Sequence, residues 1–168
     1  MKAKLLVRFT VLGRAEPRGS KTIAKAKNGR TFIRDDNPHS KAWMRCVARA
    51  GRMAMGSTEA TDLPCVLVVT IFRHRPKGHF GTRGLLLSAA AYPATKPDLT
   101  KCVRGIEDGL NGVVWTDDSR VVEQRTKKRF GDREEVLIEV FTLPATMRDG
   151  AVQAVEMRQK PLIKETGW

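Results

Sequence analysis

The chain has 168 residues, with 31 Lys and Arg against 18 Asp and Glu, which gives a formal net charge of +13 at pH 7. This length suits one domain with a buried core. The positive excess is greatest in the first fifty residues and suits phosphate binding, although ribosomal, membrane-surface and simply soluble proteins also show it. No segment has the apolar length of a signal peptide or a membrane span, which predicts a cytoplasmic protein without a membrane partner.

The first half of the chain predicts a strand, a hairpin and a helix. Leu5–Leu12 is an apolar-rich run typical of a strand. The basic loop after it contains Asn28-Gly29, a favoured turn pair that predicts a hairpin. A helix is expected to begin with Asn37 as its cap and Pro38 in its first turn. Its buried stripe is predicted to be Trp43, Val47, Ala50 and Ala54, with basic residues on the opposite side.

The middle of the chain predicts a central strand followed by a long loop. Cys65–Phe72 is nearly all apolar and rich in valine, which favours a strand covered on both faces. The segment Arg73–Pro97 carries basic residues among glycines and prolines and has little periodic pattern. A loop of this length in a small domain is usually functional or disordered.

A second helix is predicted over Leu99–Asn111, with Asp98 as its cap. Its core stripe is expected to consist of Leu99, Cys102, Val103, Ile106 and Leu110. Gly105 and Gly109 would weaken this helix unless they allow close packing. Cys102, Cys46 and Cys65 are far apart, which excludes a zinc site or a disulfide framework and predicts reduced, mostly buried residues.

Two further strands, Val121–Phe130 and Val136–Leu143, complete the predicted elements. The fold class is therefore α/β (α+β), a single domain with a mixed β-sheet and two main helices. Residues 1–143 are expected to form this domain. Residues 144–168 have little pattern and are expected to be a C-terminal tail or packing arm.

The second half of the chain also holds a dense block of carboxylates with basic residues between them. Capping a helix would by itself explain Asp98, and acidic pairs such as Asp117-Asp118 often only make turns. Magnesium prefers such oxygen ligands, however, and neighbouring cations can hold the phosphate on which the metal acts. The sequence therefore favours a metal-dependent nuclease. The block consists of Asp98, Glu107, Asp108, Asp117 and Asp118, flanked by Lys96, Lys101, Arg104 and Arg120.

Several blocks of the chain occur in the order and spacing of a known family. They are Pro17-Arg18-Gly19-Ser20-Lys21, Asp35-Asp36-Asn37-Pro38, Pro76-Lys77-Gly78-His79, Tyr92–Leu99, Glu107–Val122 and Lys127–Gly131. With these blocks the chain resembles the RusA-type Holliday-junction resolvases, in their phage-like branch. These are small dimeric endonucleases of mixed α/β fold that act in DNA recombination and repair.

The resemblance implies a Mg²⁺- or Mn²⁺-dependent cut at four-way DNA junctions. Asp98 and the Asp117-Asp118 pair match the family's metal-binding aspartates. We expect a metal-bound water to attack the phosphodiester in line, so that no histidine base is required. Lys101 and Arg104 would position the scissile phosphate, and Arg104 stands where the family has a lysine. A broader guanidinium therefore replaces a compact ammonium.

The largest departure from the family pattern is Thr100, where an aspartate is usual. A threonine hydroxyl can ligate magnesium but brings no negative charge, so it should weaken metal capture. Three outcomes follow. Asp98, Asp117 and Asp118 suffice; or Glu107 or Asp108 compensates; or the protein binds junctions but cuts poorly.

The expected partners are branched DNA and a second copy of the chain. A four-way junction presents two related strands, and a two-fold homodimer offers two related sites. The residues expected to contact DNA are Arg18, Lys21, Lys77, Lys96 and Arg120. The segment Gly13–Thr22 lacks P-loop spacing, so no nucleotide cofactor is expected. The alternatives from other classes are a noncatalytic junction-binding protein and a basic RNA-binding assembly protein.

Overall fold

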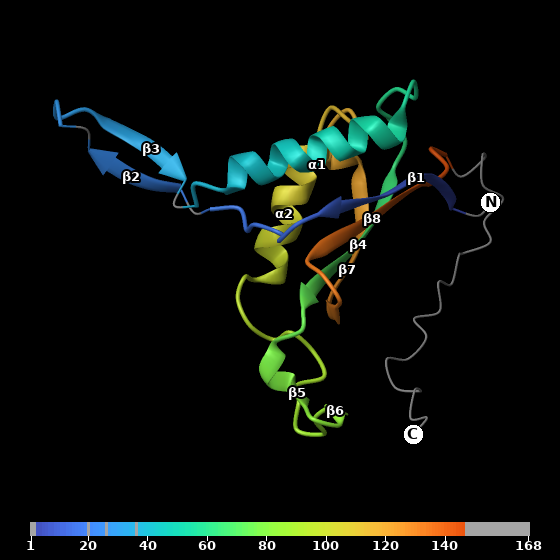
Figure 1. The fold of residues 1–168 in the computed structure, drawn as a ribbon. Coiled ribbons are helices and arrows are strands. Elements are labelled where there is room, and N and C mark those ends of the chain that lie inside the picture. Colours follow the sequence, from blue (N-terminus) through green and yellow to red (C-terminus); the bar gives the residue numbers. More distant parts are fainter. Residues whose placement is uncertain (1–2, 20, 26, 36, 147–168) are drawn as a thin grey trace.

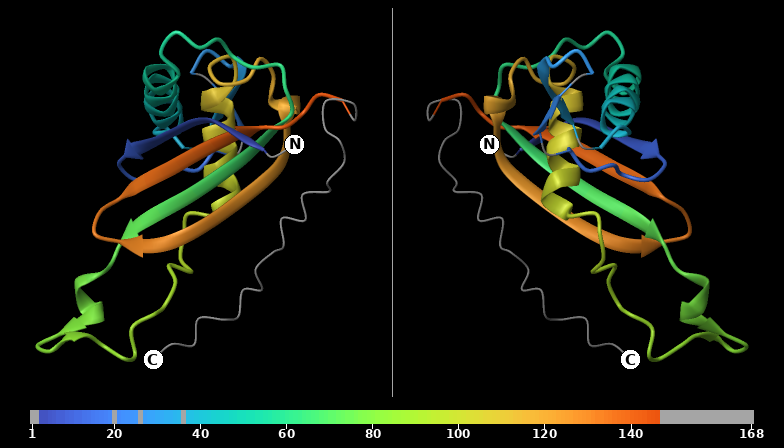
Figure 2. Two further views of the ribbon diagram at one scale, coloured as in Figure 1. Left: turned by 90° about the vertical axis from the view of Figure 1, so that its right-hand side faces the viewer. Right: turned by 90° about the vertical axis from the view of Figure 1, so that its left-hand side faces the viewer.

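The computed structural model describes residues 3–19, 21–25, 27–35 and 37–146. The elements are β1 (Lys4–Leu12), β2 (Lys21–Lys25), β3 (Thr31–Asp35), α1 (Ser40–Met55), β4 (Cys65–His74), the 3₁₀ turn η1 (Lys77–His79), β5 (Phe80–Gly81), β6 (Gly84–Leu85), α2 (Leu99–Leu110), the 3₁₀ turn η2 (Asp118–Arg120), β7 (Val121–Gly131) and β8 (Glu135–Thr142). The two helices lie on one side of a four-stranded sheet (Figures 1 and 2). The β2–β3 hairpin and the arm bearing β5 and β6 project from this body (Figure 1).

The sheet is mixed, as predicted. Its strand order is β1-β8-β4-β7, with β4 parallel to β7 and antiparallel to β8. Strand β4 takes a central position because its apolar residues can be covered on both faces. Leu67, Val69 and Ile71 point to the helix side and are at most 1% exposed. Strand β7 is left at the edge of this sheet.

The N-cap of helix α1 is His39, two residues after the predicted cap at Asn37, and the helix begins at Ser40. The Asn37 side chain instead accepts a hydrogen bond from the backbone N–H of His39 at 3.0 Å, which forms a turn before the helix. The buried stripe also differs at its end, because Ala54 is exposed while Gly51 and Met55 are buried. The four-residue progression from Trp43 and Val47 continues to Gly51 and Met55, and the Leu110 side chain lies against Gly51.

The predicted stripe of α2 is confirmed. Cys102, Val103, Ile106 and Leu110 are buried, and Leu99 packs half-buried against the core. Gly109 allows the close packing of α2 on α1, because a Cβ there would lie 2.9 Å from the Met44 backbone oxygen. Among the cysteines, Cys65 and Cys102 are buried, Cys46 is exposed, and all three are unpaired thiols.

The long segment Arg73–Pro97 is more ordered than its sequence predicts. It contains η1 and the short strands β5 and β6, which pair Phe80 with Leu85 and Gly81 with Gly84. Two-residue strands are too short to leave a periodic pattern in the sequence. Of the expected tail, residues 147–168 lie outside the described residues.

The contact between the helices predicts that Gly109→Ala destabilises the fold. The added methyl would lie 2.9 Å from the Met44 backbone oxygen and 3.2 Å from the Val47 Cβ. Overpacking of this kind costs about 1–3 kcal/mol, more than alanine returns in helix propensity. Gly105→Ala is the matched control on the same helix, since its nearest contact is an ordinary 3.4 Å. Urea unfolding should show a loss for Gly109→Ala alone, and equal midpoints would contradict the packing argument.

Candidate metal and nucleic-acid site

Asp98 occupies the N-cap position of α2, as predicted, but its side chain makes no capping hydrogen bond. Capping therefore does not account for this aspartate. Asp98 is exposed, and Thr100 and Lys101 of the first helical turn are exposed beside it in sequence. Asp98 lines a cavity of about 390 Å³ whose wall also includes Arg14, Lys96 and Lys101. A carboxylate in a cationic cleft is suited to a phosphate group and the metal that accompanies it.

A second carboxylate of this cleft, Glu16, was not anticipated from the sequence. The Asn37 side-chain amide donates to Glu16 Oε2 at 3.1 Å and to the Pro17 carbonyl at 2.9 Å. Glu16 and Asp98 line the same cavity. The only sequence signal was the position of Glu16 next to the Pro17-Arg18-Gly19 block, and that signal says nothing about the proximity of α2.

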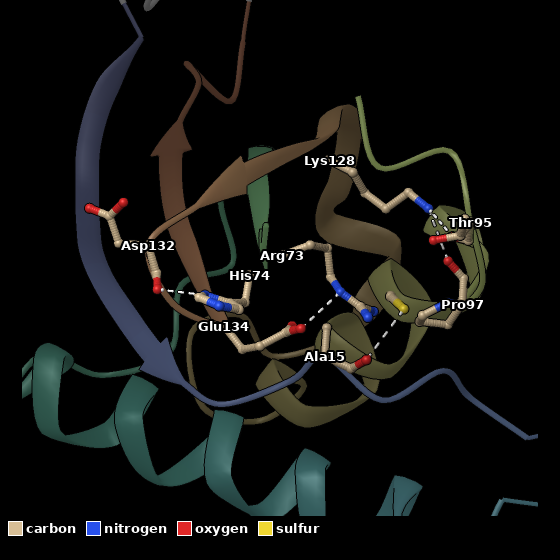
Figure 3. Close-up of polar contacts among 9 residues, drawn as sticks. Ala15, Arg73, His74, Thr95, Pro97, Lys128, Asp132 and Glu134 are labelled. Atoms are coloured by element: carbon tan, nitrogen blue, oxygen red, sulfur yellow. Dashed lines mark hydrogen bonds and ion pairs between the residues drawn. The ribbon is translucent and has the colours of Figure 1, made fainter. Parts of the chain in front are cut away.

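Lys128 of β7 holds the chain that leads into Asp98. Its Nζ donates to the carbonyl oxygens of Thr95, at 2.8 Å, and of Pro97, at 3.1 Å (Figure 3). The peptide bond between Lys96 and Pro97 is cis. Lys128 is half-buried, and two charge-assisted bonds to backbone carbonyls fix the loop where it enters the helix. The C-terminal half of β7 thereby determines where Asp98 lies.

The pair Asp117-Asp118 is located at the 3₁₀ turn that precedes β7. The Asp117 carboxylate accepts from the Ser119 backbone N–H at 3.0 Å, so the predicted turn-making role is realised. Hydrogen bonds from Ser119 are the main reason why the pKa of Asp117 is lowered, and the charge of Arg120 adds to this effect. Asp118 and Arg120 are exposed in the same turn.

Glu107 lies near the C-terminal end of α2, on the side of Asp118. Burial raises the pKa of its carboxyl, and the charges of Asp108 and Asp118 raise it further, whereas Arg104 lowers it. The Gln124 side-chain amide donates to Glu107 Oε1. Glu107 is therefore associated with the Asp118 end of the candidate site rather than with Asp98.

Asp108 is engaged in an ion pair with Arg18, at 3.1 Å between Oδ2 and Nε. Arg18 is half-buried, its guanidinium also contacts Met44 Sδ, and its backbone N–H donates to the Lys101 carbonyl at 2.9 Å. These contacts fasten the segment after β1 to α2. They argue for a structural role of Arg18 over a direct DNA contact.

Helix α2 and strand β7 run antiparallel, which separates the predicted carboxylates. Gln124 reaches Glu107 near the end of α2, and Lys128 reaches Pro97 just before its start. The 12 residues of α2 span about 18 Å. The eight residues from Val121 to Lys128 are separated by seven steps, which span about 23 Å. One chain thus places Asp98 and the Asp117-Asp118 pair at opposite ends of these elements.

The structure does not bring the predicted metal ligands together within one chain. Over the described parts of the sequence, no group of three or more His, Cys, Asp and Glu side chains is arranged to hold a metal ion.

The residues expected to contact DNA are also distributed over the structure. Lys77 is exposed on η1, Arg120 is exposed in η2, and nothing is described of the Lys21 side chain. Arg104, which was expected to position the scissile phosphate, is exposed in the middle of α2. Among the described residues, no helix is long and apolar enough to span a membrane.

The Lys128 contacts predict that Lys128→Met loosens the loop at Thr95–Pro97. Methionine keeps most of the apolar stem but cannot donate to the two carbonyls. Amide hydrogen exchange of residues 94–98 should accelerate by about tenfold or more, in keeping with the loss of charge-assisted bonds. Lys127→Met is the matched control, because Lys127 is the exposed neighbour on the same strand. Unchanged exchange in Lys128→Met would show that the loop is held by other contacts.

The raised pKa of Glu107 predicts a pH-dependent effect of Glu107→Gln. A carboxyl with a raised folded-state pKa destabilises the fold when ionised, and this penalty disappears as the pH falls through that pKa. The variant should therefore gain stability at about pH 7 and lose this gain near about pH 4, where carboxyls become protonated. Urea midpoints at both pH values measure the effect.

Glu123→Gln is the control for this measurement. Glu123 is exposed on β7 and pairs with Arg125 Nε at 2.7 Å, so its carboxylate remains in contact with solvent. A gain for Glu107→Gln that persists unchanged at low pH would refute the electrostatic cause.

Comparison with protein-family models assigns the chain to one family. The family model described as "Endodeoxyribonuclease RusA" matches residues 13–141, a stretch that includes the Asp98 cleft, the Asp117-Asp118 turn and the whole of β7. The chain is also 32% identical over 146 residues to "Uncharacterized protein YqaN" of Bacillus subtilis (strain 168), which covers 79% of this chain and 94% of that protein. The mixed sheet with two helices on one side is consistent with that family's fold. The chain therefore belongs to the RusA endodeoxyribonuclease family.

Proposed function

We propose that this protein is a Mg²⁺- or Mn²⁺-dependent endonuclease that cuts four-way DNA junctions in recombination and repair. The observation that carries the proposal is the family match over residues 13–141, which spans both carboxylate-bearing ends. The Asp98 cleft supports it, because an acidic side chain not used for capping lies there among Arg14, Lys96 and Lys101. Such a cleft attracts a DNA phosphate and keeps a carboxylate beside it.

The separation of the carboxylates bears on how a metal would be held. A single chain offers Asp98 and Glu16 at one end and Asp117 and Asp118 at the other, and the described residues of neither end form a group of three or more such ligands. A bound divalent cation would supply the activation of water near neutral pH. We therefore propose that two copies of the chain complete each site. Asp98 of one copy would then act with Asp118 of the other.

The topology supports this arrangement. Strand β7 is the edge of the four-stranded sheet, and the Asp98 and Asp118 groups lie at its two ends. A two-fold axis near the middle of β7 exchanges those ends, so the start of one strand meets the end of its copy. Val122 on this strand is 59% exposed, which provides apolar surface for such a contact. The two sites of a homodimer would match the two strands of a junction that must be cut.

Thr100 gives the proposal a specific weak point. Its exposed hydroxyl stands in the first turn of α2, where the family usually has an aspartate, and brings no charge. Glu107 and Asp108 do not replace that aspartate within one chain, since Glu107 lies toward Asp118 and Asp108 pairs with Arg18. Glu16 is the carboxylate that shares the cleft with Asp98. This arrangement leaves weak cutting as the specific alternative to full activity.

A mixing experiment tests both the nuclease activity and the shared site. Asp98→Asn and Asp118→Asn should each abolish metal-dependent nicking of a labelled junction while junction binding stays largely intact. A mixed dimer of the two variants should regain nicking, because one of its two sites keeps both aspartates. If each chain held its own complete site, the mixture would stay inactive.

The wild-type controls separate the remaining alternatives. Paired nicks on the junction that require Mg²⁺ or Mn²⁺ support the enzyme, and addition of EDTA should abolish them. Binding without cutting would support a noncatalytic junction-binding protein. Tighter binding of structured RNA than of the junction would support an RNA-binding assembly protein.

A further inference from the structure

A second cavity lies at the carboxyl ends of β4 and β7, next to the loop that leads into Asp98. It has a volume of about 220 Å³, and its lining includes His74, His79, Tyr92, Thr95 and Phe130. Thr95 belongs to the loop that Lys128 fixes through its carbonyl (Figure 3). This cavity is smaller than typical pockets for drug-sized ligands and suits one planar ring system.

The aromatic residues of this cavity are combined with arginines. Tyr92 is 56% exposed, and the Arg129 guanidinium carbon lies 4.8 Å from the centre of its ring. The Arg75 guanidinium carbon lies 4.1 Å from the centre of the Phe130 ring, and the His79 ring meets Phe130 edge-on at 5.3 Å. Exposed aromatic rings beside arginines are the stacking platforms on which nucleobases bind.

The two histidines of the cavity present complementary hydrogen-bonding atoms. The Nδ1 of His74 lies 2.8 Å from the Asp132 carbonyl oxygen, which only accepts, so Nδ1–H donates and, in the neutral ring, Nε2 is an acceptor. The Nδ1 of His79 lies 3.3 Å from Arg75 Nη1, which only donates, so Nδ1 accepts and Nε2–H is left as a donor. Nucleobase edges carry donors and acceptors of this kind.

The charge around the cavity suits a DNA strand. None of the described residues that line it is acidic, and the Arg75 and Arg129 guanidinium groups lie over the Phe130 and Tyr92 rings of its wall. The nearby carboxylate of Glu134 pairs with Arg73 Nε at 3.1 Å (Figure 3). The backbone of a DNA strand can therefore approach this surface with a favourable electrostatic contribution.

We propose that this cavity binds one unstacked nucleobase of the DNA strand whose phosphate enters the Asp98 cleft. The base stacks on Tyr92, and the two imidazoles contact its polar edge. The placement next to a cut site rests on the proposed nuclease function, whereas the binding of a base does not. Phosphate contacts position DNA without distinguishing its bases, whereas contacts to a base carry sequence preference. This cavity would therefore give the protein a preference for one base. Unstacked bases are available at a branch point at a lower cost than inside a duplex.

Binding of short single-stranded oligonucleotides in EDTA tests the proposal without any cleavage. Four homopolymers are compared with an abasic strand of the same length, by fluorescence anisotropy on the full chain. Wild-type protein should bind at least one homopolymer about tenfold more tightly than the abasic strand, which is the scale of one base stacked on an aromatic ring. Tyr92→Ala should remove this difference while leaving the affinity for the abasic strand unchanged.

Phe80→Ala is the matched control, because Phe80 is a 51% exposed aromatic residue of the same arm that does not line the cavity. It should keep the wild-type preference for bases. His74→Phe should change the ranking of the four homopolymers while retaining the advantage over the abasic strand. Equal binding of abasic and base-bearing strands by the wild type, or equal effects of Tyr92→Ala and Phe80→Ala, would overturn the proposal. These outcomes are independent of whether junctions are cut.

Discussion

The antiparallel packing of α2 on β7 is the constraint on which the candidate site depends. Helix α2 is held in place on two sides, by β7 on one and by α1 on the other. The side chains of Gln124 and Lys128 hold it to β7, while Gly109 and Gly51 allow α1 and α2 to pack closely. The chain cannot shorten the distance between Asp98 and the Asp117-Asp118 pair without unfolding α2. In the proposed shared site, carboxylates at opposite ends would meet through a second copy of the chain, and catalysis would then require assembly.

Two basic residues around α2 use their charge on partners within the fold. Arg18 neutralises Asp108 and fastens the segment after β1 to α2. Lys128 uses its charge on two backbone carbonyls next to the cis peptide bond. These two cations are already engaged by partners within the protein. The exposed cations of the cleft, Lys96 and Lys101, remain available for phosphate.

The sequence predicted most of the fold because its strongest signals are local. The valine-rich β4 and the stripe of α2 follow directly from the periodicity of apolar residues. The end of the α1 stripe was wrong at Ala54, since Gly51 and Met55 face the core and a buried glycine leaves no apolar signal. The strands β5 and β6 are held by pairing within the arm and were missed because two residues are too few to leave a periodic pattern.

The candidate site was less predictable because it depends on distances between elements. The position of Asp98 at the start of α2 follows from sequence, but the absence of a capping bond and the presence of Glu16 in the cleft do not. Likewise, the sequence places Asp98 and Asp118 twenty positions apart without saying that a helix and a strand keep them separate. The assignment of these aspartates as metal ligands stays a prediction.

The two cavities beside the Thr95–Pro97 loop have different linings and would bind different parts of a nucleotide. The Asp98 cleft is lined by cations and carboxylates, and such groups act on the phosphate that every nucleotide shares. The neighbouring cavity is lined by Tyr92, Phe130 and two histidines, whose ring faces and ring nitrogens suit the base, the part of the nucleotide that varies. Because Lys128 fixes the loop between the cavities, the position of a bound base would determine which phosphate reaches Asp98. Selectivity for a base and cutting would then be coupled through the half-buried Lys128.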